Sequence, residues 1–243
     1  MMKRARTTGG LAFGLLVLAG GSASAGPGGF TFTPPTGWVD VSRGAPETQR
    51  KKAPPALRAQ ADNPAITYLA LDPEQWDDGF VENMNVVVQT GKRALPATQE
   101  VLAEVAKAAE AEATKAGLKY HPTKIEVVKV GGVNAGRIEA DMTAPGVVSK
   151  MVQYMIPGDK SQAMLTYTTT AENFARYTPL FDASAQATLG AVEVPSSSVL
   201  GSAQIGAIAG AIGGAVGGLL IARSRRRKQL LAAQRAANPP PAA

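Results

Sequence analysis

The sequence contains no cysteine and one histidine, and aromatic residues make up only 5% of its 243 residues. Without cysteine the chain has no disulfide, no thiol nucleophile and no lipoprotein anchor. A transition-metal site of His and Cys ligands is excluded as well. A nucleophile activated by histidine would have to use His121, which we interpret instead as an ordinary loop residue between a helix and a strand. We therefore expect a protein that is not an enzyme and holds no cofactor.

Acidic residues are missing from both ends of the chain. Three of the 25 basic residues precede Gly26 and six follow Val199, whereas all 19 acidic residues lie between these positions, so 26–198 has a net charge of −3. The net charge of +6 therefore belongs to the ends. A nucleic-acid-binding domain needs clustered basic charge, and the middle of the chain lacks it. We expect no nucleic-acid partner.

The N-terminal residues have the pattern of a signal peptide. Lys3, Arg4 and Arg6 precede a short apolar stretch at 11–18, and the small residues of 22–25 fit a signal-peptidase site. We predict a signal peptide at 1–25, cleaved between Ala25 and Gly26. The alternative is a retained N-terminal anchor, for which the apolar stretch is short.

An uncharged stretch at 199–222 is long enough to cross a bilayer as one helix. The tail at 223–243 begins with a basic cluster that should stay on the cytoplasmic side and set the topology. This cluster consists of Arg223, Arg225, Arg226, Arg227 and Lys228. We predict a single-pass protein of the cell membrane, with its body outside the cytoplasm and its C-terminus inside.

Glycine recurs at every fourth position within the predicted span, at Gly206, Gly210, Gly214 and Gly218. This spacing places small residues on one helix face, where a second helix can approach closely. Homo-oligomerisation through this face is one interpretation, and a helix that is merely rich in glycine and alanine is the other.

The residues between the two ends, 26–194, predict one α+β domain, which 195–198 link to the span. Alternation around Pro34–Gly37 predicts a first hairpin or a bent strand, and 43–64 predicts a surface loop or short irregular helix. A strand is expected at 66–71, and the β-branched run at the end of 77–90 predicts a central strand covered on both faces.

The second half of the domain changes from helical to strand periodicity. Residues 98–116 have a helical period, with Thr98 as the N-terminal cap and Gly117 at the end. Gly131-Gly132 and Pro157–Lys160 predict two hairpins, with a bulge near Gly136. A final helix should begin with a capping box of Thr169 and Glu172 and be kinked or split at Pro179. These elements add up to an antiparallel sheet with helical cover.

Two groups of side chains are candidates for ligand contacts. Oxygen donors are dense at Asp72, Glu74, Asp77, Asp78 and Glu82, but their order does not fit an EF-hand, and a solvated acidic turn is the alternative to a calcium site. Aromatic residues could line a groove, although core packing is the preferred interpretation. They are Trp38, Tyr68, Trp76 and Phe80. The basic run at 50–52 could touch anionic lipid or be solvated.

Several short motifs together resemble the PsbP-like and DcrB-like group of exported domains. They are Pro34–Trp38, Gly79-Phe80 with Asn83 and Asn85, the valine run 86–88, the Gly131-Gly132 hairpin, and a Thr-rich strand followed by Phe174 and Phe181. The resemblance covers most of 26–190. It implies an antiparallel sheet sandwiched by helices, in a group whose members are mostly non-enzymatic binding or assembly factors at membranes.

We therefore expect a membrane-anchored, non-catalytic module of the bacterial cell envelope that acts through protein–protein contacts of its ectodomain. Two alternatives remain: an ectodomain that binds a small ligand or lipid, and a structural oligomer assembled through the glycine-rich span.

Overall fold

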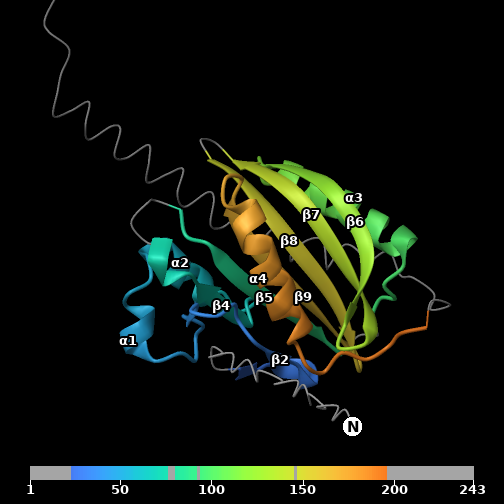
Figure 1. Cartoon of the computed structure of the whole chain (residues 1–243), viewed down its shortest axis with the longest axis horizontal. Helices are drawn as coiled ribbons and strands as arrows, with labels where there is room; N and C mark the ends of the chain where they lie inside the picture. Colours follow the sequence, from blue (N-terminus) through green and yellow to red (C-terminus); the bar gives the residue numbers. More distant parts are fainter. Residues whose placement is uncertain (1–22, 76–79, 92–93, 145–146, 196–243) are drawn as a thin grey trace, which may run out of the picture.

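The computed structural model describes residues 23–75, 80–91, 94–144 and 147–195 (Figure 1). The predicted span, its glycines and the basic cluster lie outside these residues, as do Asp77 and Asp78. The strands are β1 (Ser24–Ala25), β2 (Thr31–Phe32), β3 (Val39–Asp40), β4 (Tyr68–Leu71), β5 (Asn83–Thr90), β6 (Lys119–Val130), β7 (Val133–Ala144), β8 (Val147–Gly158) and β9 (Ser161–Thr170). The α-helices are α1 (Glu47–Arg50), α2 (Pro55–Ala61), α3 (Gln99–Lys115) and α4 (Phe174–Gln186), and two 3-10 turns are η1 (Pro27–Gly29) and η2 (Pro73–Gln75).

Seven strands form one antiparallel sheet in the order β3-β4-β5-β9-β8-β7-β6. The last four strands form a meander. Strand β9 returns to pair with the whole length of β5, from Asn83 opposite Thr168 to Thr90 opposite Ser161. The predicted central position of the valine-rich strand is confirmed, because β5 has a neighbour on each side. The α+β class with an antiparallel sheet is confirmed as well.

Two tight turns set the register of the meander. Gly131 and Gly132 have φ angles of 57° and 87°, which suit a two-residue hairpin between β6 and β7. The β8–β9 turn places Lys160 at φ 51°. The predicted bulge is at the wrong place: the register shifts in β6 between Pro122 and Lys124, whereas Gly136 pairs regularly with Val127. Pro122 has no N–H for the ladder, which explains the irregularity there.

Helix α3 begins and ends as the sequence predicts. The Thr98 hydroxyl accepts a hydrogen bond from the Val101 N–H. Gly117, at φ 74°, follows the last turn, and the Leu118 N–H donates to the Ala113 carbonyl at 2.9 Å. These contacts satisfy backbone groups that the ends of a helix otherwise leave free.

Helices cover both faces of the sheet. On the first face, α3 packs on β6 and β7 around Leu102, Val105 and Ile138, and α2 packs on β4 and β5 through Leu57 and Leu69. We call this the α3 face. On the opposite face, the α4 face, Tyr177 and Phe181 of α4 stack on an aromatic core. The sheet is therefore the middle of three layers (Figure 1).

The capping box predicted for the last helix is wrong, and the helix is not split. The Thr169 hydroxyl donates to Glu82 rather than capping the helix, and α4 begins at Phe174, with Thr170 accepting from the Asn173 N–H just before it. Pro179 lies inside α4 without splitting it. The Thr169 hydroxyl instead contacts the buried carboxylate of Glu82, and the sequence alone does not place these two residues together.

The N-terminal residues do not form the predicted hairpin. β2 pairs with β1 in a separate two-stranded sheet, and β3 pairs with β4 in the main sheet. The turn between β2 and β3 sends the chain from one sheet into the other, because Trp38 is buried against Tyr177 and Phe181 of α4. Residues 43–64, for which a surface loop or a short irregular helix was expected, contain the short helices α1 and α2.

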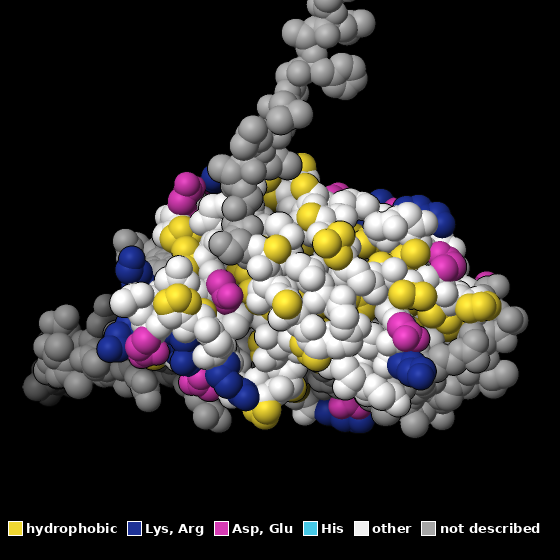
Figure 2. Space-filling view, turned by 90° about the horizontal axis from the view of Figure 1, so that it is seen from below, with side chains coloured by type: hydrophobic (Ala, Val, Ile, Leu, Met, Phe, Trp, Pro, Cys, Tyr) yellow, Lys and Arg dark blue, Asp and Glu magenta, His cyan; other side chains and the backbone are white. Residues whose placement is uncertain are grey.

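The two ends of the described chain meet at one end of the molecule. Thr31 of β2 exchanges two backbone hydrogen bonds with Leu189, and the Val192 N–H donates to the Pro157 carbonyl. Leu189 and Val192 are nevertheless 64% and 43% exposed. In a view of this end, most charged side chains lie toward the rim and uncharged atoms occupy the middle (Figure 2). Within the described ranges, which stop before the predicted span, no helix is long and apolar enough to cross a membrane.

Two carbonyl groups of the long edge strand β6 accept hydrogen bonds from glutamine side chains of two helices. The Gln99 amide of α3 donates to the Ile125 carbonyl at 3.1 Å, and the Gln186 amide of α4 donates to the Lys129 carbonyl. Exposed strand edges are templates for pairing with another chain, so both contacts oppose edge-to-edge association.

Candidate functional site

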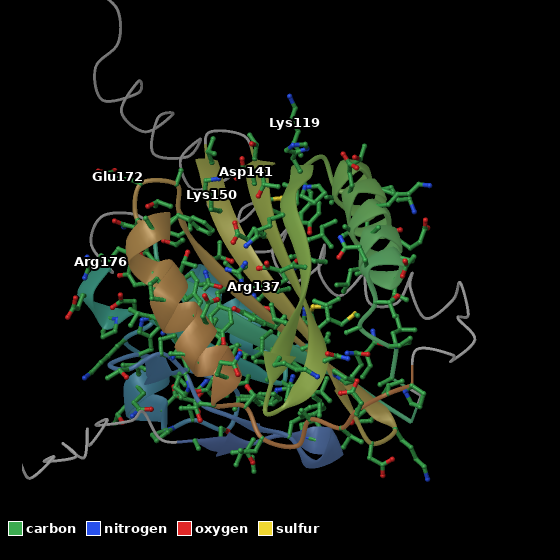
Figure 3. All side chains as sticks on the ribbon, turned by 45° about the vertical axis from the view of Figure 1, so that its right-hand side comes forward. Lys119, Arg137, Asp141, Lys150, Glu172 and Arg176 are labelled. Atoms are coloured by element: carbon green, nitrogen blue, oxygen red, sulfur yellow. The ribbon has the colours of Figure 1, made fainter. Side chains whose placement is uncertain are left out.

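The α4 face of β6, β7 and β8 carries charged side chains in a regular pattern. Ile138, Ala140 and Met142 of β7 point into the α3 core, so the residues between them point to the α4 face. We call the resulting set the charged strip; it consists of Lys119, His121, Lys124, Glu126, Arg137, Glu139, Asp141 and Lys150. Figure 3 shows Lys119, Asp141 and Lys150 toward one end of the strands and Arg137 between the sheet and α4.

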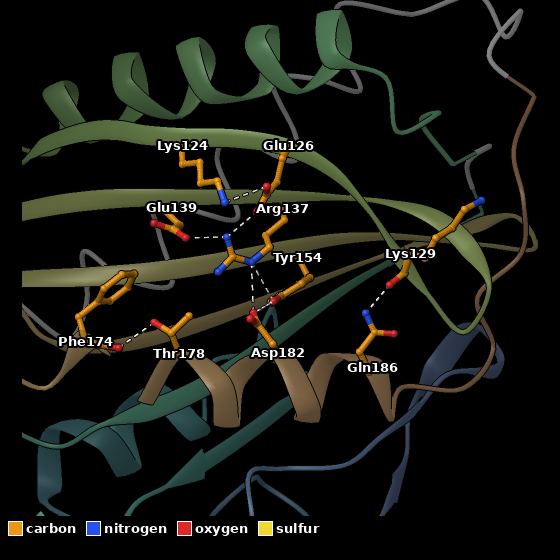
Figure 4. Close-up of polar contacts among 10 residues, drawn as sticks. All are labelled: Lys124, Glu126, Lys129, Arg137, Glu139, Tyr154, Phe174, Thr178, Asp182 and Gln186. Atoms are coloured by element: carbon orange, nitrogen blue, oxygen red, sulfur yellow. Dashed lines mark hydrogen bonds and ion pairs between the residues drawn. The ribbon is translucent and has the colours of Figure 1, made fainter. Parts of the chain in front are cut away.

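Arg137 joins the strip to α4. Its Nη1 donates to Glu126 at 2.8 Å and to Glu139 at 2.6 Å, and its Nε donates to the Tyr154 hydroxyl at 3.0 Å and to Asp182 of α4 at 3.2 Å (Figure 4). The Tyr154 hydroxyl in turn donates to Asp182. Arg137 is only 5% exposed, so these neighbours, more than solvent, compensate its charge.

The network also shifts the pKa of Arg137 and that of Glu126. Burial favours loss of the Arg137 proton, but the hydrogen bonds to Glu139 and Tyr154 and the charge of Asp182 outweigh burial and raise the pKa of Arg137. Burial would raise the pKa of Glu126, but Lys124 and Arg137 hold this pKa below its usual value. Arg137 and Glu126 therefore stabilise each other in their charged forms.

The other half of the strip is more open to solvent. Lys150 binds Asp141 at 2.5 Å and lies 5.3 Å above the ring of Phe174. Lys124 binds Glu126 at 2.9 Å and its side chain is 55% exposed. Lys119 and His121 are exposed as well. Arg137 therefore fixes one end of a surface whose other charges can reach a partner.

The structure separates the residues that the sequence singled out. His121 lies within strand β6 opposite Asp141, not in a loop as expected. Asp72 is buried and accepts a hydrogen bond from the Tyr177 hydroxyl, and Glu82 is fully buried. Among the residues that the structure describes, no group of three or more His, Cys, Asp or Glu side chains could hold a metal ion.

The aromatic residues and the basic loop also have defined places. Trp38 and Tyr68 are core residues, as preferred, and Phe80 is 8% exposed. Trp76 lies outside the described residues. In the basic run, Arg50 pairs with Glu47 and Asp62.

Arg137 and its partners are the residues that sequence reasoning missed. The signal for them is present: Arg137, Glu139 and Asp141 alternate with apolar residues in a strand that was predicted correctly. Alternation identifies a face that is polar, but the pairing of Arg137 with α4 depends on a contact 45 residues away.

The fold and the strip define an antiparallel α+β domain with a charged surface beside one covering helix. No protein-family model and no curated protein matches the sequence. Solved structures similar to the chain include a PsbP protein (CyanoP) of Synechocystis sp. PCC 6803, at 15% identity and a TM-score of 0.48, covering 74% of this chain and 96% of that one. The PsbP-like resemblance expected from the sequence is thus also found among the solved structures.

A second similar structure is LpqN, described as involved in cell envelope biogenesis of Mycobacterium tuberculosis, at 14% identity and a TM-score of 0.42, covering 68% of this chain and 84% of that one. A third comes from Bacteroides thetaiotaomicron VPI-5482, at 12% identity and a TM-score of 0.41, with 71% of this chain and 49% of that one covered. At these identities and TM-scores we transfer no activity or partner from any of the three.

Proposed function

We propose that the protein is an exported, single-pass membrane protein whose ectodomain binds a protein partner in the cell envelope and catalyses no reaction. The observation that carries this proposal is the charged strip: three long strands present both signs of charge in fixed rows, and one end is held rigid by Arg137. Rigid, patterned charge is suited to selecting a partner by electrostatic complementarity.

The mixture of signs favours a protein as the partner. The strip contains four basic and three acidic side chains together with His121, and the acidic ones separate the basic ones. A polyanion such as nucleic acid is recognised by basic residues clustered on one face. A protein surface with its own alternating charges can satisfy both signs.

The predicted span supports a binding role because it would concentrate the ectodomain at the membrane surface. A short linker at 195–198 would hold the ectodomain close to the membrane, which raises its effective concentration toward other membrane proteins. Weak contacts through the strip then suffice, and the basic cluster after the span keeps the domain on the outer side.

Crosslinking of the full-length protein in intact membranes tests the proposal. We expect a crosslinked protein partner with the wild type and at least a tenfold smaller yield with the double variant Lys119→Glu and Lys124→Glu. The matched control is Lys107→Glu with Lys115→Glu on α3, which changes the net charge equally on the other face of the sheet. Equal loss in both variants, or no loss in either, contradicts binding through the strip.

A second arm separates the ectodomain from the span. If 26–198 is fused to an unrelated span and keeps the same partner, the ectodomain does the binding. If only self-crosslinks are found, and these disappear with the exchanged span or with Gly210→Ile and Gly214→Ile, the glycine face is the functional element. The partner-binding proposal is then wrong.

A further inference from the structure

A row of uncharged polar side chains crosses the middle of the α3 face. The apolar cluster under α3 lies on one side, including Met151, Met155 and Met164, and the cluster under α2 lies on the other. Between them, strands β5, β9 and β8 contribute the polar row, which consists of Asn83, Asn85, Gln153, Thr166 and Thr168. All five side chains are buried, with exposed fractions of 2% or less.

Half of this row is satisfied by hydrogen bonds. The Tyr120 hydroxyl donates to Gln153 at 3.0 Å, and the Gln153 amide donates to the Thr166 hydroxyl at 3.4 Å. The register explains the chain of contacts, because Gln153 and Asn85 lie on either side of Thr166. The row therefore continues from Gln153 and Thr166, which have hydrogen-bond partners, to Asn83 and Asn85 of β5.

In the other half, the Asn83 amide donates to the Val81 carbonyl at 3.1 Å, but four side-chain atoms have no hydrogen-bond partner within the part of the chain that the structure describes. The unpaired atoms are Oδ1 of Asn83, both polar atoms of the Asn85 amide and Oγ1 of Thr168. These residues are direct neighbours, since Asn83 lies opposite Thr168 and Asn85 is two positions along the same face. Buried polar groups are normally paired with other groups of the protein. Four unpaired atoms in one place therefore point to groups that bind a ligand.

The chemistry of these atoms defines what they can hold. Amide and hydroxyl groups supply donors and acceptors together, and the row carries no charge. A neutral hydroxyl group, which donates and accepts, matches such a set. The methionines on one side and Leu69, Leu71 and Val87 on the other offer apolar contact.

We propose that the polar row binds the hydroxyl-bearing part of a neutral amphiphile, whose apolar part lies along the flanking methionine and leucine side chains. This site is on the face opposite the charged strip and does not depend on the proposed partner. Because Asn85 is fully buried, the side chains around it must move for the ligand to reach it, and binding is expected to be slow on the NMR timescale.

Two identical substitutions in one strand separate a ligand site from a structural row. Thr168→Val removes an unpaired hydroxyl, and Thr166→Val removes one that Gln153 uses. We expect Thr168→Val and Asn85→Leu to leave the melting temperature of the full-length protein unchanged or raised, and Thr166→Val to lower it. If Asn85→Leu or Thr168→Val lowers the melting temperature as much as Thr166→Val does, both groups have structural partners and the proposal is wrong.

Binding is measured on the full-length protein in lipid nanodiscs through the NMR signals of its methionine methyl groups. Octyl glucoside, below its micelle-forming concentration, is the probe, with glucose and 1-octanol as the arms for a free sugar and an apolar chain. We expect saturable changes at Met151 and Met164 with octyl glucoside, at least tenfold weaker apparent binding in Asn85→Leu, and weaker effects of glucose. The same changes with 1-octanol as with octyl glucoside, or none in the wild type, overturn the proposal.

Discussion

Arg137 shows how one side chain can tie a strand to a helix. Its guanidinium contacts two carboxylates of the sheet and the carboxylate of Asp182 on α4, and Tyr154 completes the set. Removing the cation would leave three acidic groups side by side, with only part of their charge solvated.

We therefore expect Arg137→Met to lower the free energy of unfolding by about 3 kcal/mol, measured by urea denaturation. Arg176→Met is the control, because Arg176 is 60% exposed and reaches Glu74 only at 3.7 Å. The control should change stability by no more than about 0.5 kcal/mol. Similar effects of the two variants would show that the network adds nothing to an ordinary surface pair.

All five tyrosines should resist ionisation while the protein is folded. Burial is the main cause that raises the pKa of each phenol above its ordinary value; they are Tyr68, Tyr120, Tyr154, Tyr167 and Tyr177. A raised pKa means that the folded state holds the proton more tightly, so this stabilisation is complete below about pH 10 and is lost as the pH rises further.

An absorbance titration of tyrosinate tests this prediction. We expect no phenolate signal before unfolding, and then all five tyrosines ionising in one cooperative step that coincides with loss of the circular dichroism signal. A tyrosine that titrates reversibly near pH 10 in the folded protein would contradict the burial described for it.

At the residue scale, the sequence predicted contacts between near neighbours in the chain. It did not predict contacts between residues that are far apart in the chain. Thr98 and Gly117 were assigned correctly because capping depends on neighbours within one turn. Thr169 was assigned wrongly because its partner, Glu82, is 87 residues away.

At the scale of elements, α3 sits close to β7 because of one missing side chain. A Cβ at Gly136 would collide with the side chain of Leu102, which is fully buried. Gly136 is therefore needed for a close approach of helix and strand, not for the bulge that its position suggested.

Gly136→Ala should destabilise the protein by about 1–3 kcal/mol, because the buried leucine has to shift or α3 has to move outward. Gly44→Ala is the matched control, since no atom lies within 4 Å of a Cβ built there. Thermal unfolding of both variants provides the comparison. Equal melting temperatures would mean that α3 accommodates the methyl group without cost.

The long elements were predictable and the short ones were not. The two hairpins of the meander and α3 have strong periodic patterns and explicit turn residues. β2 and β3 are two residues each, and their assignment to different sheets follows from aromatic packing against α4 rather than from their own alternation.

For the whole molecule, the order of the sheet could not be read from the sequence. β5 and β6 are consecutive strands but lie at opposite sides of the meander, because α3 carries the chain across the α3 face. The polar row escaped prediction for the same reason: its members belong to three strands that only the sheet order brings together.

The shared end of the two termini predicts which surface faces the lipid. The described chain stops at Pro195, shortly before the predicted span, and Leu189 and Val192 are exposed beside it. If the span is inserted as predicted, this end should contact the bilayer surface, with its charged residues at the rim (Figure 2).

Because the chain has no native cysteine, a single introduced cysteine can be labelled selectively to test this orientation. An environment-sensitive fluorophore on Leu189→Cys of the vesicle-reconstituted protein should be quenched by nitroxide-labelled lipid. The same label on Val148→Cys should not, because Val148 lies about 30 Å away along β8 at 3.3 Å per residue. Equal quenching at both sites contradicts this orientation, whereas protein that fails to float with the vesicles contradicts the span itself.

The glutamines that bind carbonyl groups of β6 matter most where many copies share one membrane. Molecules confined to a plane collide sideways far more often than molecules in solution, and an open strand edge could capture a neighbour at each encounter. Gln99 and Gln186 already occupy carbonyl groups that such a neighbour would need. Copies that collide in a crowded membrane can then separate again without pairing their β6 strands into a shared sheet.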